Sequence, residues 1–186
     1  DLAISGFTTT PVTCNGLNDG TATVLFTGGV GPFAIQWFKD ALYTDPFTDS
    51  TDALFQNMHP DSMYYVQITD FLTCITRQGI SITEPPVLAA NVTDSSMVGC
   101  FGDNSGDATV TPSGGTGGYT YNWEDALGGT IGTNALVTGL SVGKFYVTVY
   151  DDNLCEAYDS VSITEPLAPL TATFTDTTLS SCNASD

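Results

Sequence analysis

The chain has 186 residues, of which 21 are acidic and 3 are lysine or arginine, for a net charge of −18. This charge excludes nucleic acid as a partner, because phosphate binding requires clustered cations, and it disfavours anionic membrane surfaces. Disorder and membrane insertion are excluded too, because 41% hydrophobic and 11% aromatic residues suffice for a packed core, and no apolar run approaches the roughly 20 residues of a membrane helix.

Alternating apolar residues predict β-strands through the first half of the chain. The clearest runs are Ala22–Phe26, Phe33–Trp37 and Tyr64–Ile68, in which every second residue is apolar or aromatic. Glycine, asparagine and aspartate turns separate these runs, and no segment shows the 3.6-residue period of a helix. The pattern therefore predicts an all-β fold.

The same pattern returns in the second half. "CNGLNDGTATV" at Cys14–Val24 returns as "CFGDNSGDATV" at Cys100–Val110, and "ISITEPPV" at Ile80–Val87 returns as "VSITEPLA" at Val161–Ala168. Self-similarity at a fixed period is typical of tandem modules. The repeated Glu-Pro ends a module, because proline cannot donate to a strand ladder.

A third copy of the pattern begins near the end of the chain. Leu2, Leu88 and Leu170 each lie 12 positions before a cysteine. We therefore predict repeat 1 at residues 1–87, repeat 2 at 88–169, and the first strand of a truncated third repeat at 170–186. The opening residues lack the basic start and apolar run of a signal peptide, so we expect mature protein or an excised piece.

Each repeat is predicted to be an immunoglobulin-like (PKD-like) β-sandwich of about seven strands. The aromatic runs of the two repeats end in Trp37 and Trp123, on the third predicted strand of each. A buried tryptophan at that place is typical of immunoglobulin-like sandwiches. We therefore expect both side chains in the core.

The chain offers little material for catalysis. "GLSVG" at Gly139–Gly143 matches the pattern of a serine nucleophile, but that motif needs a strand-to-helix turn, a histidine and an acid. Here it joins two predicted strands, and His59 is the only histidine. We predict a turn at this place and no enzyme activity.

The ordered set of motifs resembles the SprB-type repeat of Bacteroidota cell-surface adhesins, named for a gliding-motility adhesin. The shared elements are Cys-x-Gly-x-x-x-Gly, an aromatic strand ending in Trp, a Gly-Leu-Ser-x-Gly turn, an Asp near a cysteine, and Ile-Thr-Glu-Pro. Repeat 1 departs from them, with Asn57–Asp61 in place of the Gly-Leu-Ser turn and a longer loop at Lys39–Asp52. The resemblance implies a large, type IX-secreted surface protein in which such modules form a stalk.

Five cysteines in an acidic, Thr- and Gly-rich chain indicate an oxidising, extracellular setting. The family resemblance implies one disulfide in each repeat, Cys14–Cys74 and Cys100–Cys155. The alternative is pairing between adjacent repeats: if the strand count places the two cysteines of a repeat at opposite ends of the sandwich, Cys14–Cys155 becomes a candidate. Cys182 is left over, and we expect its partner in the missing part of the third repeat.

Acidic loops make Ca²⁺ the only cofactor candidate, because this ion favours six to eight oxygen ligands. The same residue types are also the ordinary residues of tight turns, and no EF-hand spacing is present. The candidate oxygens belong to Asn18, Asp19, Asp70, Glu84, Asp103, Asn104, Asp107, Asp151, Asp152 and Glu165.

The expected function is structural. Tandem sandwiches would form the stalk of a secreted filamentous adhesin that serves adhesion and gliding motility, with neighbouring repeats of the same chain as the main contacts. One alternative is a binding module whose variable loop at Lys39–Asp52, or exposed aromatics such as Phe38, Tyr65 and Tyr146, contact a surface glycan or another surface protein. Another is a self-associating fibre in which Leu170–Asp186 adds as a strand to a neighbouring chain.

Overall fold

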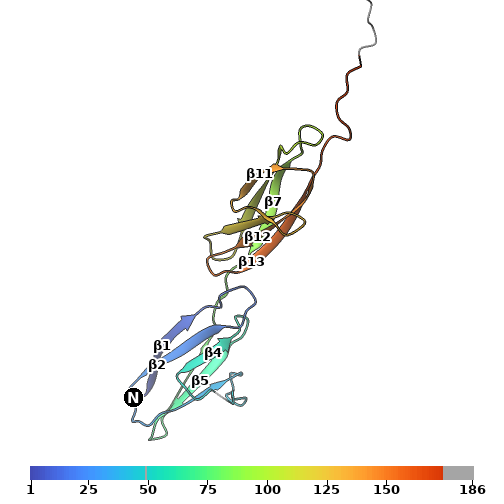
Figure 1. Cartoon of the computed structure of the whole chain (residues 1–186). Helices are drawn as coiled ribbons and strands as arrows, with labels where there is room; N and C mark the ends of the chain where they lie inside the picture. The colour runs from blue at the N-terminus through green and yellow to red at the C-terminus, as the bar shows by residue number, and fades with distance from the viewer. Residues whose placement is uncertain (49, 174–186) are drawn as a thin grey trace, which may run out of the picture.

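The computed structural model describes residues 1–48 and 50–173. These residues form thirteen β-strands without a helix, so no helix within them is long and apolar enough to cross a membrane. The strands build two β-sandwiches that follow one another end to end (Figure 1). The predicted all-β, immunoglobulin-like architecture is confirmed.

The first sandwich, here called repeat 1, contains two three-stranded antiparallel sheets with orders β1-β2-β4 and β3-β5-β6. The strands are β1 (Ala3–Thr10), β2 (Gly20–Thr27), β3 (Ala34–Phe38), β4 (Leu54–Met58), β5 (Tyr64–Thr69) and β6 (Ile75–Ile80). Strand β5 alternates buried and half-buried residues along its length. This alternation matches the period of two in its sequence, which points one face into the core.

The second sandwich, repeat 2, has the same order with one added edge strand, in sheets β11-β8-β7 and β10-β9-β12-β13. The strands are β7 (Ala89–Ser96), β8 (Gly106–Ser113), β9 (Thr120–Glu124), β10 (Thr130–Gly132), β11 (Leu136–Leu140), β12 (Gly143–Tyr150) and β13 (Glu156–Ile163). The expected number of about seven strands compares with seven in repeat 2 and six among the described residues of repeat 1. In the described part of the longer loop of repeat 1, an isolated bridge between Phe38 and Pro46 stands in place of β10.

Each sandwich has its own core, centred on a tryptophan of its third strand. Trp37 and Trp123 are fully buried. Each indole Nε1 donates a 3.0 Å hydrogen bond to a backbone carbonyl oxygen. The acceptor is Asp52 in repeat 1 and Asn134 in repeat 2. The segment between the third strand and the next core strand thus closes over the indole in both repeats, although it has strand β10 only in repeat 2.

The strand directions determine at which end of the sandwich each cysteine lies. Strand β4 is antiparallel to β2, and β5 is antiparallel to β3. Since β2 and β3 are joined by a short loop at one end, β3 and β4 run the same way, and residues 39–53 must carry the chain back along the sandwich. Strand β5 consequently ends at the opposite end from β1.

The linker, residues 84–87, enters repeat 2 against a glycine that tolerates no side chain. Gly114 has a φ of +74°, and a Cβ built there would collide with the backbone carbonyl oxygen of Val87. Gly28 meets the carbonyl of Asp1 in the same way in repeat 1. The glycine pairs Gly28-Gly29 and Gly114-Gly115, at equivalent places in the two repeats, therefore let the incoming chain pack against the end of each sandwich.

We expect Gly114→Ala to lower the free energy of unfolding by more than about 3 kcal/mol, because it adds a backbone collision to left-handed strain. Gly117 is the matched control: its φ is +82° but its Cβ would meet open space, so Gly117→Ala should cost only about 1–2 kcal/mol. Urea denaturation of both variants checks this. Equal losses of unfolding free energy in the two variants would show that the linker does not pack closely against Gly114.

Candidate functional site: the junction between the repeats

A disulfide joins the two repeats across their junction. Cys14, in the loop after β1, is bonded to Cys155, in the loop before β13, with their Cα atoms 5.7 Å apart. Cys74 and Cys100 are not bonded among the described residues, and both are exposed. The pairing implied by the family resemblance, Cys14–Cys74 and Cys100–Cys155, is therefore wrong, and the alternative pairing between repeats is the one observed. Cys182 lies outside the described residues.

The end-to-end arrangement of the strands explains the correction. Cys14 follows β1 and Cys74 follows β5, and these strands end at opposite ends of repeat 1. The sandwich length thus separates the two cysteines of one repeat. The same topology in repeat 2 turns Cys155 toward the junction and Cys100 away from it, so Cys155 meets Cys14.

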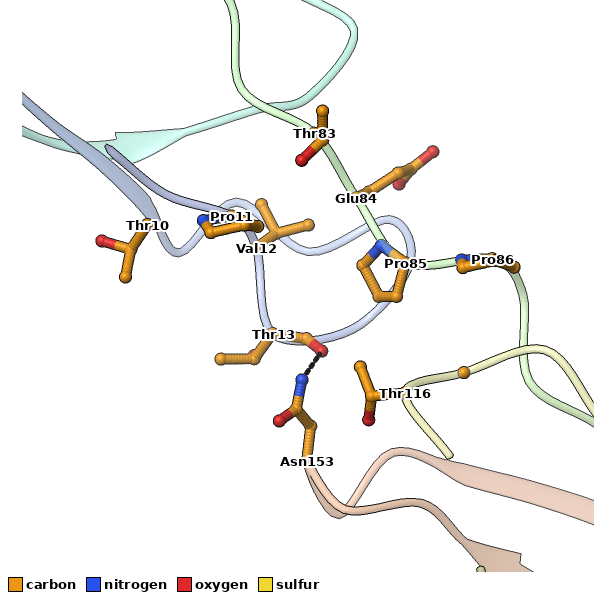
Figure 2. A pocket seen from close by; sticks show the side chains of 11 residues that line it. Thr10, Pro11, Val12, Thr13, Thr83, Glu84, Pro85, Pro86, Thr116 and Asn153 are labelled. Atoms are coloured by element: carbon orange, nitrogen blue, oxygen red, sulfur yellow. Dashed lines mark hydrogen bonds between the residues drawn. The ribbon is translucent and has the colours of Figure 1, made fainter. Parts of the chain in front are cut away.

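Hydrogen bonds between the repeats surround the disulfide. The Asn153 side chain donates to the carbonyl oxygen of Thr13 at 2.8 Å, as Figure 2 shows. The backbone N–H of Gly115 donates to the carbonyl oxygen of Pro86 at 2.9 Å. These contacts come from both sides of an open pocket at the junction, whose walls are the loop after β1, the linker, and the two loops of repeat 2 that face them.

The linker itself is stiffened by its own residues. Glu84 accepts a hydrogen bond from the backbone N–H of Gly16 at 2.8 Å, and the side chain of Asn15 donates to the carbonyl oxygen of Pro85 at 3.0 Å. Both contacts tie the linker to the loop that holds Cys14. Pro85 and Pro86 have fixed φ angles, so few backbone torsions remain free. The junction is consequently both crosslinked and short of flexible bonds.

A buried aspartate shapes the loop that carries each second cysteine. Asp151 Oδ1 accepts hydrogen bonds from the backbone N–H groups of Cys155 and Asn153, each at 2.9 Å, and Oδ2 accepts one from Thr116 at 3.0 Å. Burial is the largest influence on this carboxyl and opposes ionisation, but the backbone hydrogen bonds together outweigh it and lower the pKa of Asp151. The ionised carboxylate thus fixes the position of Cys155.

We expect Asp151→Asn to lower stability at pH 7 by about 2 kcal/mol, because an amide presents an N–H where Thr116 or Cys155 needs an acceptor. The folded-state pKa is depressed, so the carboxylate stabilises the fold above the unfolded value of about 3.9 and loses this effect as pH falls through the folded pKa. Melting between pH 7 and pH 3 should show a shallower acid loss in the variant. Exposed Asp94→Asn is the control, and an identical pH profile in Asp151→Asn would contradict the assignment.

The acidic residues considered as Ca²⁺ ligands are spread over loops of both repeats, where several accept hydrogen bonds within their own loops. Asp19 accepts hydrogen bonds from Thr13, Asp103 accepts one from the N–H of Asn104, and Glu165 accepts one from Gly102. Within residues 1–48 and 50–173, no group of three or more His, Cys, Asp or Glu side chains is placed to hold a metal ion. Calcium binding stays a prediction, and the described residues do not indicate where the ion would bind.

A second cluster lies on the outer face of the β3-β5-β6 sheet. Tyr43, from the long loop of repeat 1, packs edge-on against Phe38 and Tyr65, with ring centroids 5.3 and 5.9 Å away. The guanidinium of Arg77 lies 4.5 Å from the centre of the Tyr43 ring. Burial raises the pKa of Tyr43, and the charge of Arg77 offsets part of that effect.

This cluster corrects one expectation and adds a residue that the sequence analysis missed. Phe38 was expected to be exposed but is 92% buried, because the loop folds over it. Tyr146 is exposed, as expected. Tyr43 lies in an irregular loop with a positive φ, so no strand alternation pointed to it. The "GLSVG" segment joins β11 to β12 and forms the predicted turn.

The family model for the SprB repeat matches this chain twice, over residues 6–41 and 89–128. The first match spans Cys14, Gly28 and Trp37, and the second spans their counterparts in repeat 2. The resemblance seen in the motifs is therefore confirmed in two regions of the chain, which together cover less than half of its residues. A search of curated proteins found no significant match to this chain.

Several solved structures are similar to the chain. One is a C-terminal 282-residue fragment of intimin in complex with the intimin-binding domain of its receptor Tir, at 15% identity and a TM-score of 0.42. The alignment covers 87% of this chain and 64% of that fragment, so the chain spans less than two thirds of the fragment. A second is DIP-gamma IG1+IG2, at 11% identity and a TM-score of 0.40, with 89% of this chain and 97% of that chain aligned. A third is murine CEACAM1b, at 11% identity and a TM-score of 0.35, with 89% of this chain and 100% of that chain aligned.

The matches to the SprB repeat indicate adhesin-like cell-surface repeats and point to a structural, non-catalytic domain. The disulfide fits an extracellular location, since such bonds persist in oxidising compartments.

Proposed function

We propose that the two repeats are a stiff spacer in the stalk of a filamentous cell-surface adhesin. The observation that carries this proposal is the junction, where the Cys14–Cys155 disulfide crosslinks the end of one sandwich to the start of the next. A module that only presented a binding loop would not need a covalent bond to its neighbour. A spacer does, because bending at the joints would shorten its reach.

The charge of the chain supports the same role. The net charge of −18 is carried by 21 acidic residues against 3 basic ones. Like charges on neighbouring stalks repel one another within a Debye length of about 8 Å at physiological salt. The acidic surface would therefore keep parallel filaments from adhering to one another along their length.

Immunogold labelling of intact source cells, with antibody raised against the 186-residue chain, tests the spacer function. We expect gold spaced along surface filaments, and pre-incubation of the antibody with purified chain should abolish the label. Gold confined to filament tips or to contact zones would contradict a spacer and would make these repeats the binding element.

The aromatic cluster around Tyr43 favours one second candidate, a sugar-binding loop. It joins aromatic faces to Arg77, one of the three basic residues of the chain. Aromatic faces with a few convergent polar groups are common features of small-ligand sites. The variable loop of repeat 1 would then be the contact surface.

If this candidate is correct, Tyr43→Ala should weaken binding to a glycan array by at least about tenfold, the equivalent of 1.4 kcal/mol. Tyr146→Ala is the matched control, because Tyr146 also lies beside a cation, Lys144 at 5.1 Å, but belongs to repeat 2. No binding by the unmodified chain, or equal binding by both variants, would exclude the sugar-binding loop.

A further inference from the structure

Two cysteines occupy the outer ends of the pair of repeats. Cys74 takes the place in repeat 1 that Cys155 has in repeat 2, and Cys100 takes the place in repeat 2 that Cys14 has in repeat 1. Both are exposed, and neither is bonded within the described residues. We propose that each forms a disulfide with an adjoining SprB repeat of the same polypeptide, in the arrangement of the Cys14–Cys155 junction.

The loop of Cys74 already has the junction conformation. Asp70 Oδ1 accepts a hydrogen bond from the N–H of Cys74 at 2.8 Å, as Asp151 does from Cys155 at 2.9 Å. Asp70 Oδ2 accepts one from Val30 at 3.1 Å, which matches the bond from Thr116 to Asp151 in repeat 2. This loop therefore presents its cysteine outward before any partner is bonded.

The loop of Cys100 is preformed in the same way. The N–H of Gly102 donates to Glu165 at 2.7 Å, and its counterpart Gly16 donates to Glu84 at 2.8 Å. Next to Cys100 lies a pocket formed by residues 99–101, Pro166 and residues 168–171. It includes Gly99 and Pro166, the counterparts of Thr13 and Pro85 in the junction pocket. The outer end of repeat 2 is thus one half of a junction.

Exposed apolar side chains surround the two outer cysteines. Val30, Phe71 and Leu72 are 47%, 66% and 61% exposed at the outer end of repeat 1, and Phe101 is 48% exposed at that of repeat 2. At the inner junction the equivalent positions are polar: Thr116, Asp152, Asn153 and Asn15. Both outer ends therefore present apolar surface where the inner junction has polar residues. A neighbouring repeat seated there would cover that surface.

The bond chemistry is an ordinary thiol oxidation. Each new disulfide forms when two thiols lose two protons and two electrons, and the electrons reduce the disulfide of a thiol–disulfide oxidoreductase to its dithiol. The sequence pattern that starts again at Leu170 favours a partner in the same polypeptide. A filament of such repeats would carry one disulfide at every joint.

The test is a disulfide map of the protein taken from the cell surface. Free thiols are blocked with N-ethylmaleimide before denaturation and trypsin digestion, which cleaves after Lys39, Arg77 and Lys144. Fragment 40–77 then contains Cys74, and fragment 78–144 contains Cys100. Tandem mass spectrometry should find nearly all of fragment 40–77 linked to a peptide with a Cys-x-Gly motif from another repeat. Fragment 78–144 should be linked to one with an Asp-x-x-x-Cys motif.

The Cys14–Cys155 linkage in the same digest is the control against disulfide exchange. Alkylated Cys74 or Cys100, or a bond from either to a cysteine of its own repeat, would overturn the proposal. A linkage of fragment 40–77 to fragment 78–144 would also overturn it, because it would join two copies of the chain. The disulfide proposal rests on the proposed spacer function in one respect: it requires further repeats next to these two. Free thiols together with gold along filaments would reject the linkage and leave the spacer in place.

Discussion

Removing the Cys14–Cys155 disulfide should produce the largest loss of stability of any change considered. The bond spans 141 positions in sequence and closes a loop that includes most of both repeats. In the chain-entropy model a loop of this length stabilises the folded state by about 5 kcal/mol. We therefore expect the Cys14→Ser/Cys155→Ser variant to unfold at markedly lower urea concentration, with the two repeats unfolding in separate transitions.

The junction should also bend once the bond is gone. Small-angle X-ray scattering of the intact chain should fit one extended arrangement, whereas the double variant should require a distribution of bend angles. Cys74→Ser/Cys100→Ser is the matched control, since both cysteines are exposed and unbonded within the described residues, and surface changes of this kind usually shift stability by no more than about 0.5 kcal/mol. Equal stability and shape in both double variants would contradict the role given to the bond.

The second large effect is expected from the core tryptophan. Trp123 is fully buried and donates a hydrogen bond to the carbonyl oxygen of Asn134. Trp123→Ala leaves a cavity and an unsatisfied carbonyl, so we expect a loss of about 3–5 kcal/mol. Tyr158→Ala removes a 67% exposed ring from the same repeat and should change stability little. Thermal unfolding checks both, and a melting point unchanged by Trp123→Ala would refute its place in the core.

The parts of the fold that depend on local pattern could be predicted from the sequence. Period-two alternation in Tyr64–Ile68 gave a strand, and burial in the structure follows it residue by residue. The tryptophans follow the same rule at the end of their aromatic runs. The duplicated motifs indicated two modules because each motif marks a turn or strand end that a sandwich needs in the same place.

The disulfide pairing could not be predicted in the same way, because it depends on which end of the sandwich each loop reaches. That depends on whether residues 39–53 cross the sandwich, and in repeat 1 the described residues of this segment do so without a regular strand. A strand count made on alternation alone misses this crossing and places Cys14 and Cys74 at the same end. The burial of Phe38 escaped prediction for a related reason, since the irregular loop that covers it has no period.

The most direct test of this account is the disulfide pattern of the purified chain, in a Cys182→Ser variant so that fragment 145–186 keeps one cysteine. After thiols are blocked, trypsin places Cys14, Cys74, Cys100 and Cys155 in four separate fragments. The junction predicts that fragment 1–39 leaves the column bonded to fragment 145–186 and that the other two are alkylated. Fragment 1–39 bonded to 40–77, together with 78–144 bonded to 145–186, would mean that each repeat is crosslinked only within itself and that no covalent bond joins the two repeats.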